Sequence, residues 1–208
     1  ITFSSTKDDI ELNEKRVLMK QLNTIIPADQ YDNDLILDSI TIDADARYLS
    51  TSTPAQAYRA RMGDDDVAVI FPVIAPNGYN GPIDLLVGIY TDGNIAGVRV
   101  VKHRETPGLG DAVSETHSDW ILDFDGKSLS NPAASRWKVR RDGGEFDQFT
   151  GATVTPRAVV RAVHNALLYY DVNKQALFEP VQTTTEPSDG TGDGDADNAT
   201  SDISEIRP

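Results

Sequence analysis

A threonine-rich turn ahead of a helix holds the residues whose types and spacing could do chemistry. The stretch "DQFTGATVTPRAVVRAV", residues 147–163, sets three hydroxyls around two small residues: Thr150, Gly151, Ala152, Thr153 and Thr155. We expect a helix from Pro156 onward, with Thr155 as its N-cap. Because unpaired N–H groups and a partial positive charge at a helix N-terminus favour phosphate, the turn is a candidate anion site. Gly151 would let the backbone approach the anion, and the Thr153 hydroxyl could lie where the phosphate lies. The same residues could also be an ordinary threonine-rich cap, which is commoner.

A second unusual stretch, "KHRETPGLGDAV", runs from Lys102 to Val113. It leaves an expected strand directly into a turn that includes Glu105, Thr106, Pro107, Gly108, Leu109 and Gly110. Two glycines two residues apart permit a tight turn and close approach of the backbone to a ligand. The dinucleotide fingerprint needs G-x-G-x-x-G at the start of a helix, which is not what stands here. Taken alone, the stretch is better explained as a plain connection between a strand and a helix.

The other reactive side chains give no competing site. The histidines at positions 103, 117 and 164 have no metal-ligand spacing, and we expect His164 on the surface of a helix. The run Asp64–Asp66 is typical of a solvated surface. A hydrolase with Thr153 or a serine as nucleophile and His103 as base would lack a G-x-S-x-G elbow and an identifiable third partner.

Composition narrows the classes of function. The 208 residues carry a net charge of −14, which argues against binding to nucleic acid or adhesion to an anionic membrane through charge. The absence of cysteine excludes disulfides, thiolate metal sites and cysteine nucleophiles. The longest apolar run, residues 67–75, is too short for a membrane helix. Because the chain begins at Ile1 rather than methionine, we expect a processed or truncated product whose preceding segment is out of view.

The periodicity of apolar residues predicts an α+β fold with one domain, mostly an antiparallel β-meander with flanking helices. The expected strands lie at residues 34–42, 57–62, 66–75, 83–91 and 95–103, with a further one around Trp137 and Val139. The expected helices lie at residues 5–26, 113–124 and 156–170. "DGN" at residues 92–94 indicates a hairpin turn, and "PNGYNGP" at 76–82 is rich in turn residues.

We divide the chain into an N-terminal helix at residues 1–27, a folded domain at 28–180 and a tail at 181–208. The tail consists largely of Thr, Asp, Gly, Ser and Asn, with seven acidic residues against one arginine. Such a composition cannot bury enough apolar area to offset the entropy lost on ordering, so we expect the tail to be disordered.

Three motifs together resemble the FMN-binding domain found in the G subunit of the Rnf electron-transport complex. They are "GYNGPI", "HRETPGLGD" and "DQFTGATVTPRAVV", in this order and spacing. The sister family is the C subunit of the sodium-translocating NADH:quinone reductase, and "YDND", "RWKVRRDGG" and "TPRAVV" favour the Rnf family. The resemblance covers about residues 31–170 and does not include the acidic tail.

The resemblance implies a covalent flavin. In that family the phosphate of FMN is esterified to the last threonine of the D-x-x-T-G-A-T motif, which is Thr153 here, by a flavin transferase that uses FAD and a divalent metal. The other expected cofactor contacts are the rest of this turn, the "ETPGLG" turn with Leu109 against the flavin ring, and two aromatic residues: Thr150, Gly151, Ala152, Val154, Thr155, Glu105, Thr106, Pro107, Gly108, Gly110, Tyr79 and Trp120.

The resemblance also implies a role and a place for the protein. As a subunit of a translocase-type oxidoreductase it would relay electrons between ferredoxin and NAD with ion movement, without a catalytic acid or base or a metal site. An N-terminal helix missing from this chain would anchor it to the bacterial inner membrane, on the periplasmic side. Its expected partners are the other subunits of the complex and the transferase. There are two alternatives. The protein could be the same flavoprotein in a complex that reduces a redox-sensing transcription factor, or it could be a noncatalytic periplasmic binding or scaffold module.

Overall fold

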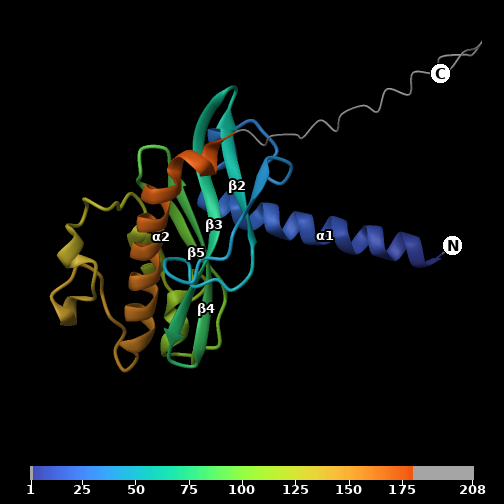
Figure 1. Cartoon of the computed structure of the whole chain (residues 1–208). Helices are drawn as coiled ribbons and strands as arrows, with labels where there is room; N and C mark the ends of the chain where they lie inside the picture. The colour runs from blue at the N-terminus through green and yellow to red at the C-terminus, as the bar shows by residue number, and fades with distance from the viewer. Residues whose placement is uncertain (1, 180–208) are drawn as a thin grey trace, which may run out of the picture.

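The computed structural model describes residues 2–179, with side chains from residue 11 onward. Its centre is a five-stranded antiparallel sheet in which each strand pairs with the next along the chain (Figure 1). The strands are β1 (Ser39–Ile42), β2 (Ala55–Met62), β3 (Asp65–Gly78), β4 (Gly81–Tyr90) and β5 (Ile95–Lys102). The expected α+β meander in a single domain is therefore confirmed.

One long helix covers each face of the sheet. Helix α2 (Val154–Phe178) packs on one face, and α1 (Thr2–Ile25) lies against the other. Alternate residues of β3 serve the two helices, because successive side chains of a strand point to opposite faces. Val69, Phe71 and Val73 belong to the core under α2, whereas Ala68 and Ile70 belong to the core under α1. This double coverage explains why β3 reads as a continuous apolar run.

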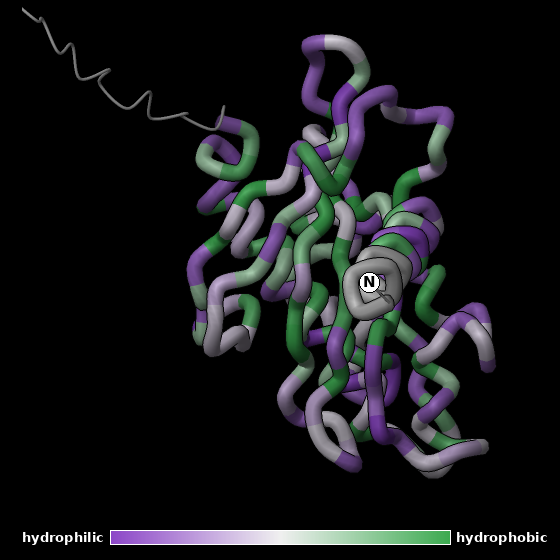
Figure 2. The backbone as a smooth tube through the Cα atoms, turned by 90° about the vertical axis from the view of Figure 1, so that its right-hand side faces the viewer, coloured by the Kyte–Doolittle hydropathy of each residue, from purple (hydrophilic) through white to green (hydrophobic). Residues whose placement is uncertain are grey.

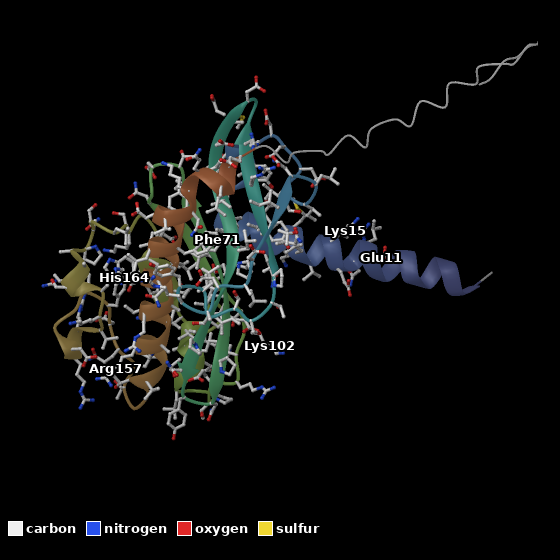
Figure 3. The ribbon with its side chains drawn as sticks, in the orientation of Figure 1. Glu11, Lys15, Phe71, Lys102, Arg157 and His164 are labelled. Atoms are coloured by element: carbon white, nitrogen blue, oxygen red, sulfur yellow. The ribbon has the colours of Figure 1, made fainter. Side chains whose placement is uncertain are left out.

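Only the C-terminal part of α1 belongs to the body of the domain. Leu22 and Ile25 are buried against the sheet, where Figure 2 shows α1 end-on beside strands coloured mostly as hydrophobic. Glu11 and Lys15 lie on the exposed part that projects away from the sheet, while Phe71 lies in its centre (Figure 3). The first turns of α1 are thus held away from the sheet.

The segment between β5 and α2 has little regular structure and is held by aromatic packing. It contains four short 3-10 helices: η2 (Gly110–Val113), η3 (Asp119–Phe124), η4 (Ala134–Arg136) and η5 (Arg140–Asp142). A fifth, η1 (Ala28–Gln30), follows α1. Phe124 packs on Phe146 with ring centroids 4.7 Å apart, and Trp137 packs on Phe146 at 5.1 Å. These rings extend the core under α2 beyond the sheet.

Three expected elements differ from the structure. Residues 35–38 form a turn instead of strand, because the Asp34 carboxylate accepts hydrogen bonds from the backbone N–H groups of Ile36 and Leu37. The helix expected at 113–124 is the separate pieces η2 and η3, although Trp120 and Phe124 are buried as expected. The strand expected near Trp137 is a single bridge between Val139 and Phe146.

Helix α2 is longer than expected at both ends, running from Val154 to Phe178. Among the residues that the structure describes, no helix combines the length and apolarity needed to cross a bilayer. The tail predicted at 181–208 lies outside the described residues.

Candidate functional site

The two unusual stretches of the sequence meet at the N-terminus of α2. The Thr155 hydroxyl donates a hydrogen bond to Oε2 of Glu105. Leu109 reaches the threonine-rich turn, since a Cβ built on Gly151 would lie 3.6 Å from its Cδ2. The turns at 105–110 and 150–155 therefore form one site.

The hairpin turn between β3 and β4 completes this site. The backbone N–H of Asn80 donates to Oε1 of Glu105 at 2.9 Å, and the N–H of Tyr79 donates to Oε2 at 3.2 Å. The Asn80 side chain donates to the Thr106 hydroxyl at 2.9 Å. The sequence analysis did not include Asn80 among the site residues. The one feature of the sequence that pointed to Asn80 was its position in the turn-rich stretch "PNGYNGP".

Thr153, and not Thr155, is the N-cap of α2. It is a half-buried residue with φ −72° and ψ −24°, and its side chain makes no capping hydrogen bond, so the hydroxyl is not committed to the helix. Our expectation that Thr155 is the N-cap is wrong, because Thr155 lies inside the first turn and is fully buried. Pro156 accordingly falls within the first turn, where a missing N–H still costs nothing.

Backbone geometry of the turn fits the approach of a phosphate. Gly151 has φ +80°, a conformation that favours glycine and leaves no Cβ over the turn. The N–H groups of Val154 and Thr155 open the helix, where no intrahelical acceptor exists for them. A hydroxyl without a capping role beside such N–H groups is a donor set suited to a phosphate ester. The residues present therefore fit the phosphate end of FMN.

Three side chains on the turns that form the site expose apolar or aromatic surface. Leu109 is 45% exposed, Val154 is 43% exposed and Tyr79 is 69% exposed. These are the residues that could contact a ring system held at the turn. Pro107 and Gly108 are exposed, whereas Gly110 is buried between Glu105 and Thr155.

Trp120 is buried beneath the start of the motif. Its indole N–H donates to the Asp147 carbonyl at 2.9 Å, and its ring packs edge-on against Phe149 at 5.1 Å. From this place Trp120 supports the turn that carries Ala152 and Thr150. A direct contact with the cofactor, which we expected for it, stays a prediction.

Two ion pairs brace the loop before the turn. Arg140 pairs with Asp147 at 2.8 Å, and Arg157 of α2 holds Asp142 through two hydrogen bonds of 2.6 Å. The bonded Arg157 guanidinium lowers the pKa of the Asp142 carboxyl, and Asp142 in turn raises the pKa of Arg157. Both pairs are largely exposed, so they orient the loop more than they stabilise it.

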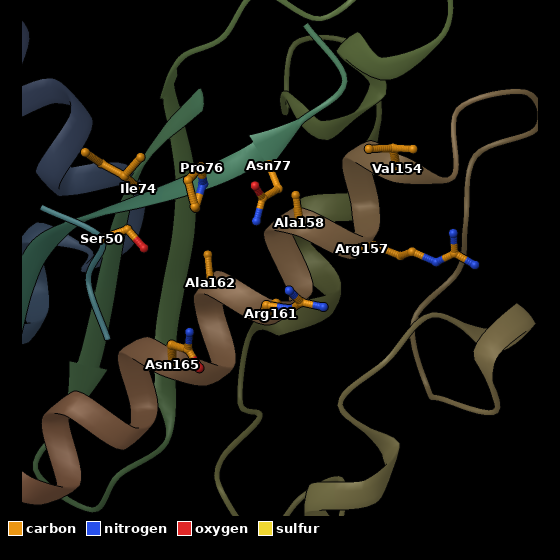
Figure 4. A pocket seen from close by; sticks show the side chains of 10 residues that line it. All are labelled: Ser50, Ile74, Pro76, Asn77, Val154, Arg157, Ala158, Arg161, Ala162 and Asn165. Atoms are coloured by element: carbon orange, nitrogen blue, oxygen red, sulfur yellow. The ribbon is translucent and has the colours of Figure 1, made fainter. Parts of the chain in front are cut away.

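A groove of about 340 Å³, which shares Val154 with this site, lies on the flank of α2 (Figure 4). Its lining includes Ser50, Asn77, Val154, Arg161 and Asn165. Ser50 has φ +55°, which is uncommon for a residue other than glycine.

Within residues 11–179 no cluster of three or more metal-ligating side chains occurs.

His164 differs from the surface residue that we expected. It is half-buried and stacks on Trp137, with ring centroids 5.2 Å apart and planes inclined by 20°. Burial lowers the pKa of its imidazole. His164 is therefore part of the packing between α2 and the aromatic segment.

Comparison with known proteins agrees with this geometry. Residues 78–168 match the family described as FMN-binding domain, and this range contains all the candidate site residues. The chain is 46% identical over 178 residues to the G subunit of the ion-translocating oxidoreductase complex of Pseudoalteromonas atlantica, covering 86% of this chain and 82% of that protein. It is 47% identical over 178 residues to the protein of the same name from Vibrio atlanticus, covering 86% and 84%. For that of Pseudomonas aeruginosa the identity is 50% over 161 residues, covering 77% and 75%.

These relatives are similar to this protein over most of both chains, and the matched FMN-binding region holds the two turns that meet at the N-terminus of α2. The chain thus belongs to the family of the G subunits of ion-translocating oxidoreductase complexes.

Proposed function

We propose that this chain is an electron-transfer subunit of an ion-translocating oxidoreductase complex and carries FMN esterified through its phosphate to Thr153. The observation that carries the proposal is the uncommitted Thr153 hydroxyl at the start of α2, beside the turn that holds Leu109. The match of residues 78–168 to the FMN-binding domain family supports the choice of cofactor.

Attachment would be a phosphoryl transfer from FAD. Oγ of Thr153 bonds to the phosphorus of the FMN half, and the pyrophosphate P–O bond breaks. AMP leaves with the bridging oxygen, and the hydroxyl proton passes to a base of the transferase. Gly151 keeps the approach to Oγ free of a side chain, and the first N–H groups of α2 lie where the diester charge would be.

The protein residues would position the flavin, and the flavin supplies the redox chemistry when bound. Leu109 and Val154 offer exposed apolar surface next to the ester, and Tyr79 offers an exposed aromatic ring. A covalent bond removes the need for a deep pocket, because the cofactor cannot dissociate. This agrees with a site formed by turns at the surface of the domain.

The proposal extends to partners and place. The names of the relatives suggest that this chain assembles with other subunits of such a complex, and the resemblance to the Rnf family suggests electron flow between ferredoxin and NAD. The same resemblance suggests a membrane anchor ahead of α1, a position of the domain on the periplasmic side of the bacterial inner membrane, and maturation by a flavin transferase. The projection of α1 from the domain is compatible with such an anchor (Figure 1).

The test is the mass of the chain after incubation with FAD, a divalent metal and a purified flavin transferase. We expect the wild-type chain to gain the mass of one FMN unit and to keep flavin fluorescence on a denaturing gel. Thr153→Ala should gain neither, with a melting temperature within about 4 °C of wild type, because a hydroxyl that makes no capping hydrogen bond contributes little stability.

Thr150→Ala is the matched control, since it removes a hydroxyl from an exposed threonine of the same turn. It should still carry covalent flavin. Loss of the flavin in Thr150→Ala with retention in Thr153→Ala would show that the ester is on Thr150 and not on Thr153. A wild-type chain that gains no mass would indicate that the turn is only a helix cap.

A further inference from the structure

Glu105 is a buried carboxylate for which the proposed electron transfer has no use. The residue is 5% exposed, and within the described part of the chain it forms no ion pair. Burying a carboxylate without a cation is costly unless hydrogen bonds satisfy its oxygens. Its presence therefore calls for a purpose at this position.

Every polar contact of the Glu105 carboxylate comes from a donor. The N–H groups of Tyr79 and Asn80 and the hydroxyl of Thr155 all point at its two oxygens. An ionised carboxylate only accepts, so it matches this set of donors. The donors belong to the β3–β4 turn and the first turn of α2, and Glu105 itself follows β5. One side chain thus joins three segments that are distant in sequence.

Two glycines make room for this carboxylate. A Cβ on Gly110 would lie 2.8 Å from Oε2 of Glu105 and 2.9 Å from Oγ1 of Thr155. A Cβ on Gly78 would lie 3.0 Å from Oε1 of Glu105, in addition to overlapping the carbonyl oxygen of Gly81. The contact between Glu105 and Thr155 therefore leaves no room for a side chain at Gly110, which explains why the "PGLG" motif has a glycine at this position.

We propose that Glu105 is the positioning residue of the flavin-acceptor turn: through Thr155 it holds the first turn of α2 so that the Thr153 hydroxyl lies beside the 105–110 turn. Thr155 lies two residues after Thr153, in the same helical turn. A shift of Thr155 away from Glu105 moves Thr153 relative to Leu109. This inference rests on the proposed covalent attachment, and it assigns to Glu105 a role in presenting the acceptor to the transferase.

Glu105→Gln is the primary variant because it keeps the size of the side chain. The amide has one acceptor oxygen, and its NH₂ group must face at least one of the three donors. We expect the initial rate of FMN transfer to Thr153 to fall about tenfold, the factor expected for loss of a hydrogen bond to a charged group. Thr155→Val removes the same contact from the other side, and Thr155→Ser retains the hydroxyl.

The rate is measured on the 208-residue chain with FAD, a divalent metal and purified flavin transferase, at a temperature where every variant is fully folded by circular dichroism. Leu22→Ala is the stability control, because it removes a buried side chain on the opposite face of the sheet. A readout without cofactor is amide hydrogen exchange at residues 150–153 of the unlabelled chain.

The expected pattern is specific to positioning. Glu105→Gln and Thr155→Val should slow transfer alike, the double variant should be no slower than either, and Thr155→Ser should restore the rate. Exchange at 150–153 should accelerate in the slow variants, and Leu22→Ala should leave both quantities at wild-type values despite its lower stability.

Three results would overturn the inference. One is transfer to Glu105→Gln at the wild-type rate with unchanged exchange, which leaves the proposed attachment intact. Another is slowing of Leu22→Ala to the same degree, which would reduce Glu105 to a stabilising residue. The third is a wild-type chain that accepts no flavin at all, which would remove the covalent attachment and the role of Glu105 together.

Discussion

Leu109 and Gly151 lie next to each other, so that a Cβ added to Gly151 would lie 3.6 Å from Cδ2 of Leu109. The contact joins the "PGLG" turn to the turn that carries Thr153. Leu109 is nevertheless 45% exposed, which leaves an apolar side chain facing solvent at the proposed flavin site. Its exposure has a reason if the flavin ring covers it.

Leu109→Ala should change the flavin more than the fold. Because the side chain is exposed, we expect the free energy of unfolding of the unlabelled chain to change by no more than about 1 kcal/mol. In the flavin-loaded chain, fluorescence should be quenched more readily by iodide, since one side of the ring loses its cover. Stern–Volmer quenching and urea unfolding measure the two effects.

Val172→Ala serves as the control for Leu109→Ala, because Val172 is an exposed valine near the other end of α2. It should alter neither the quenching nor, by more than a small amount, the stability. Equal iodide quenching in wild type and Leu109→Ala would show that the ring does not lie on Leu109.

Gly108→Val tests the backbone of the same turn. Gly108 has φ +76°, and a Cβ there would meet no atom within 4 Å, so the variant is strained by its backbone and not by a clash within the chain. We expect a loss of about 1–2 kcal/mol in the unlabelled chain. The loss should be larger, and the flavin spectrum shifted, in the loaded chain if the cofactor occupies the open space.

Gly63 offers a matched comparison for Gly108. It has φ +60° in the turn between β2 and β3, and a Cβ there also meets nothing within 4 Å. Gly63→Val should cost the same with and without flavin. If Gly108→Val also lost equal stability in both forms and left the spectrum and potential unchanged, the turn would be structural only.

The β-meander and α2 could be predicted from the sequence because the patterns that indicate them each lie within a single element. The apolar runs of β3 and β4, the "DGN" turn and the helical stripe of α2 each act within one element. The turn at 35–38 was missed because the Asp34 carboxylate accepts hydrogen bonds from two backbone N–H groups, which outweighs the apolar sequence Leu35–Leu37. Within residues 103–153 the local pattern predicted a helix at 113–124 and a strand near Trp137 that do not form, because aromatic packing from several segments holds this part of the chain.

The two turns that meet at the candidate site could be selected from the sequence, but Asn80 and the arrangement of the turns could not. The turn chemistry and the family motifs identify Thr153, Gly151 and the 105–110 turn. The role of Thr155 could not be predicted from its neighbours in sequence, because its hydrogen-bond partner Glu105 lies in another segment. The burial of these two residues is likewise not evident from the sequence. A threonine before a proline resembles a cap unless the acceptor of its hydroxyl is known.

Gly88→Ala should destabilise the packing of α1 on the sheet. A Cβ on Gly88 would overlap Cγ2 of Ile25, and one on Gly97 would lie 3.3 Å from the Cα of Ile25. We expect a loss of about 1–3 kcal/mol for the overpacked variant, measured by urea unfolding. The double variant Gly88→Ala/Ile25→Ala should recover part of it by relieving the overlap. Failure of the second change to recover any stability would mean that the cost arises within β4 instead.

His164 should give the chain a pH-dependent stability. Burial against Trp137 holds the imidazole pKa below its ordinary value of about 6.5. Between the folded and unfolded pKa values the unfolded chain binds more protons, so this contribution to stability is complete above pH of about 6.5 and is lost as the pH falls through the folded pKa. Wild type should therefore lose stability from pH 7.5 to 5.5 relative to His164→Phe, which keeps an aromatic ring on Trp137. Urea unfolding at both pH values measures the difference, and the titration of the His164 ring protons by NMR gives the folded pKa directly. A midpoint at or above 6.5, or parallel stability curves for the two proteins, would contradict the prediction and would mean that protonated His164 remains solvated in the fold.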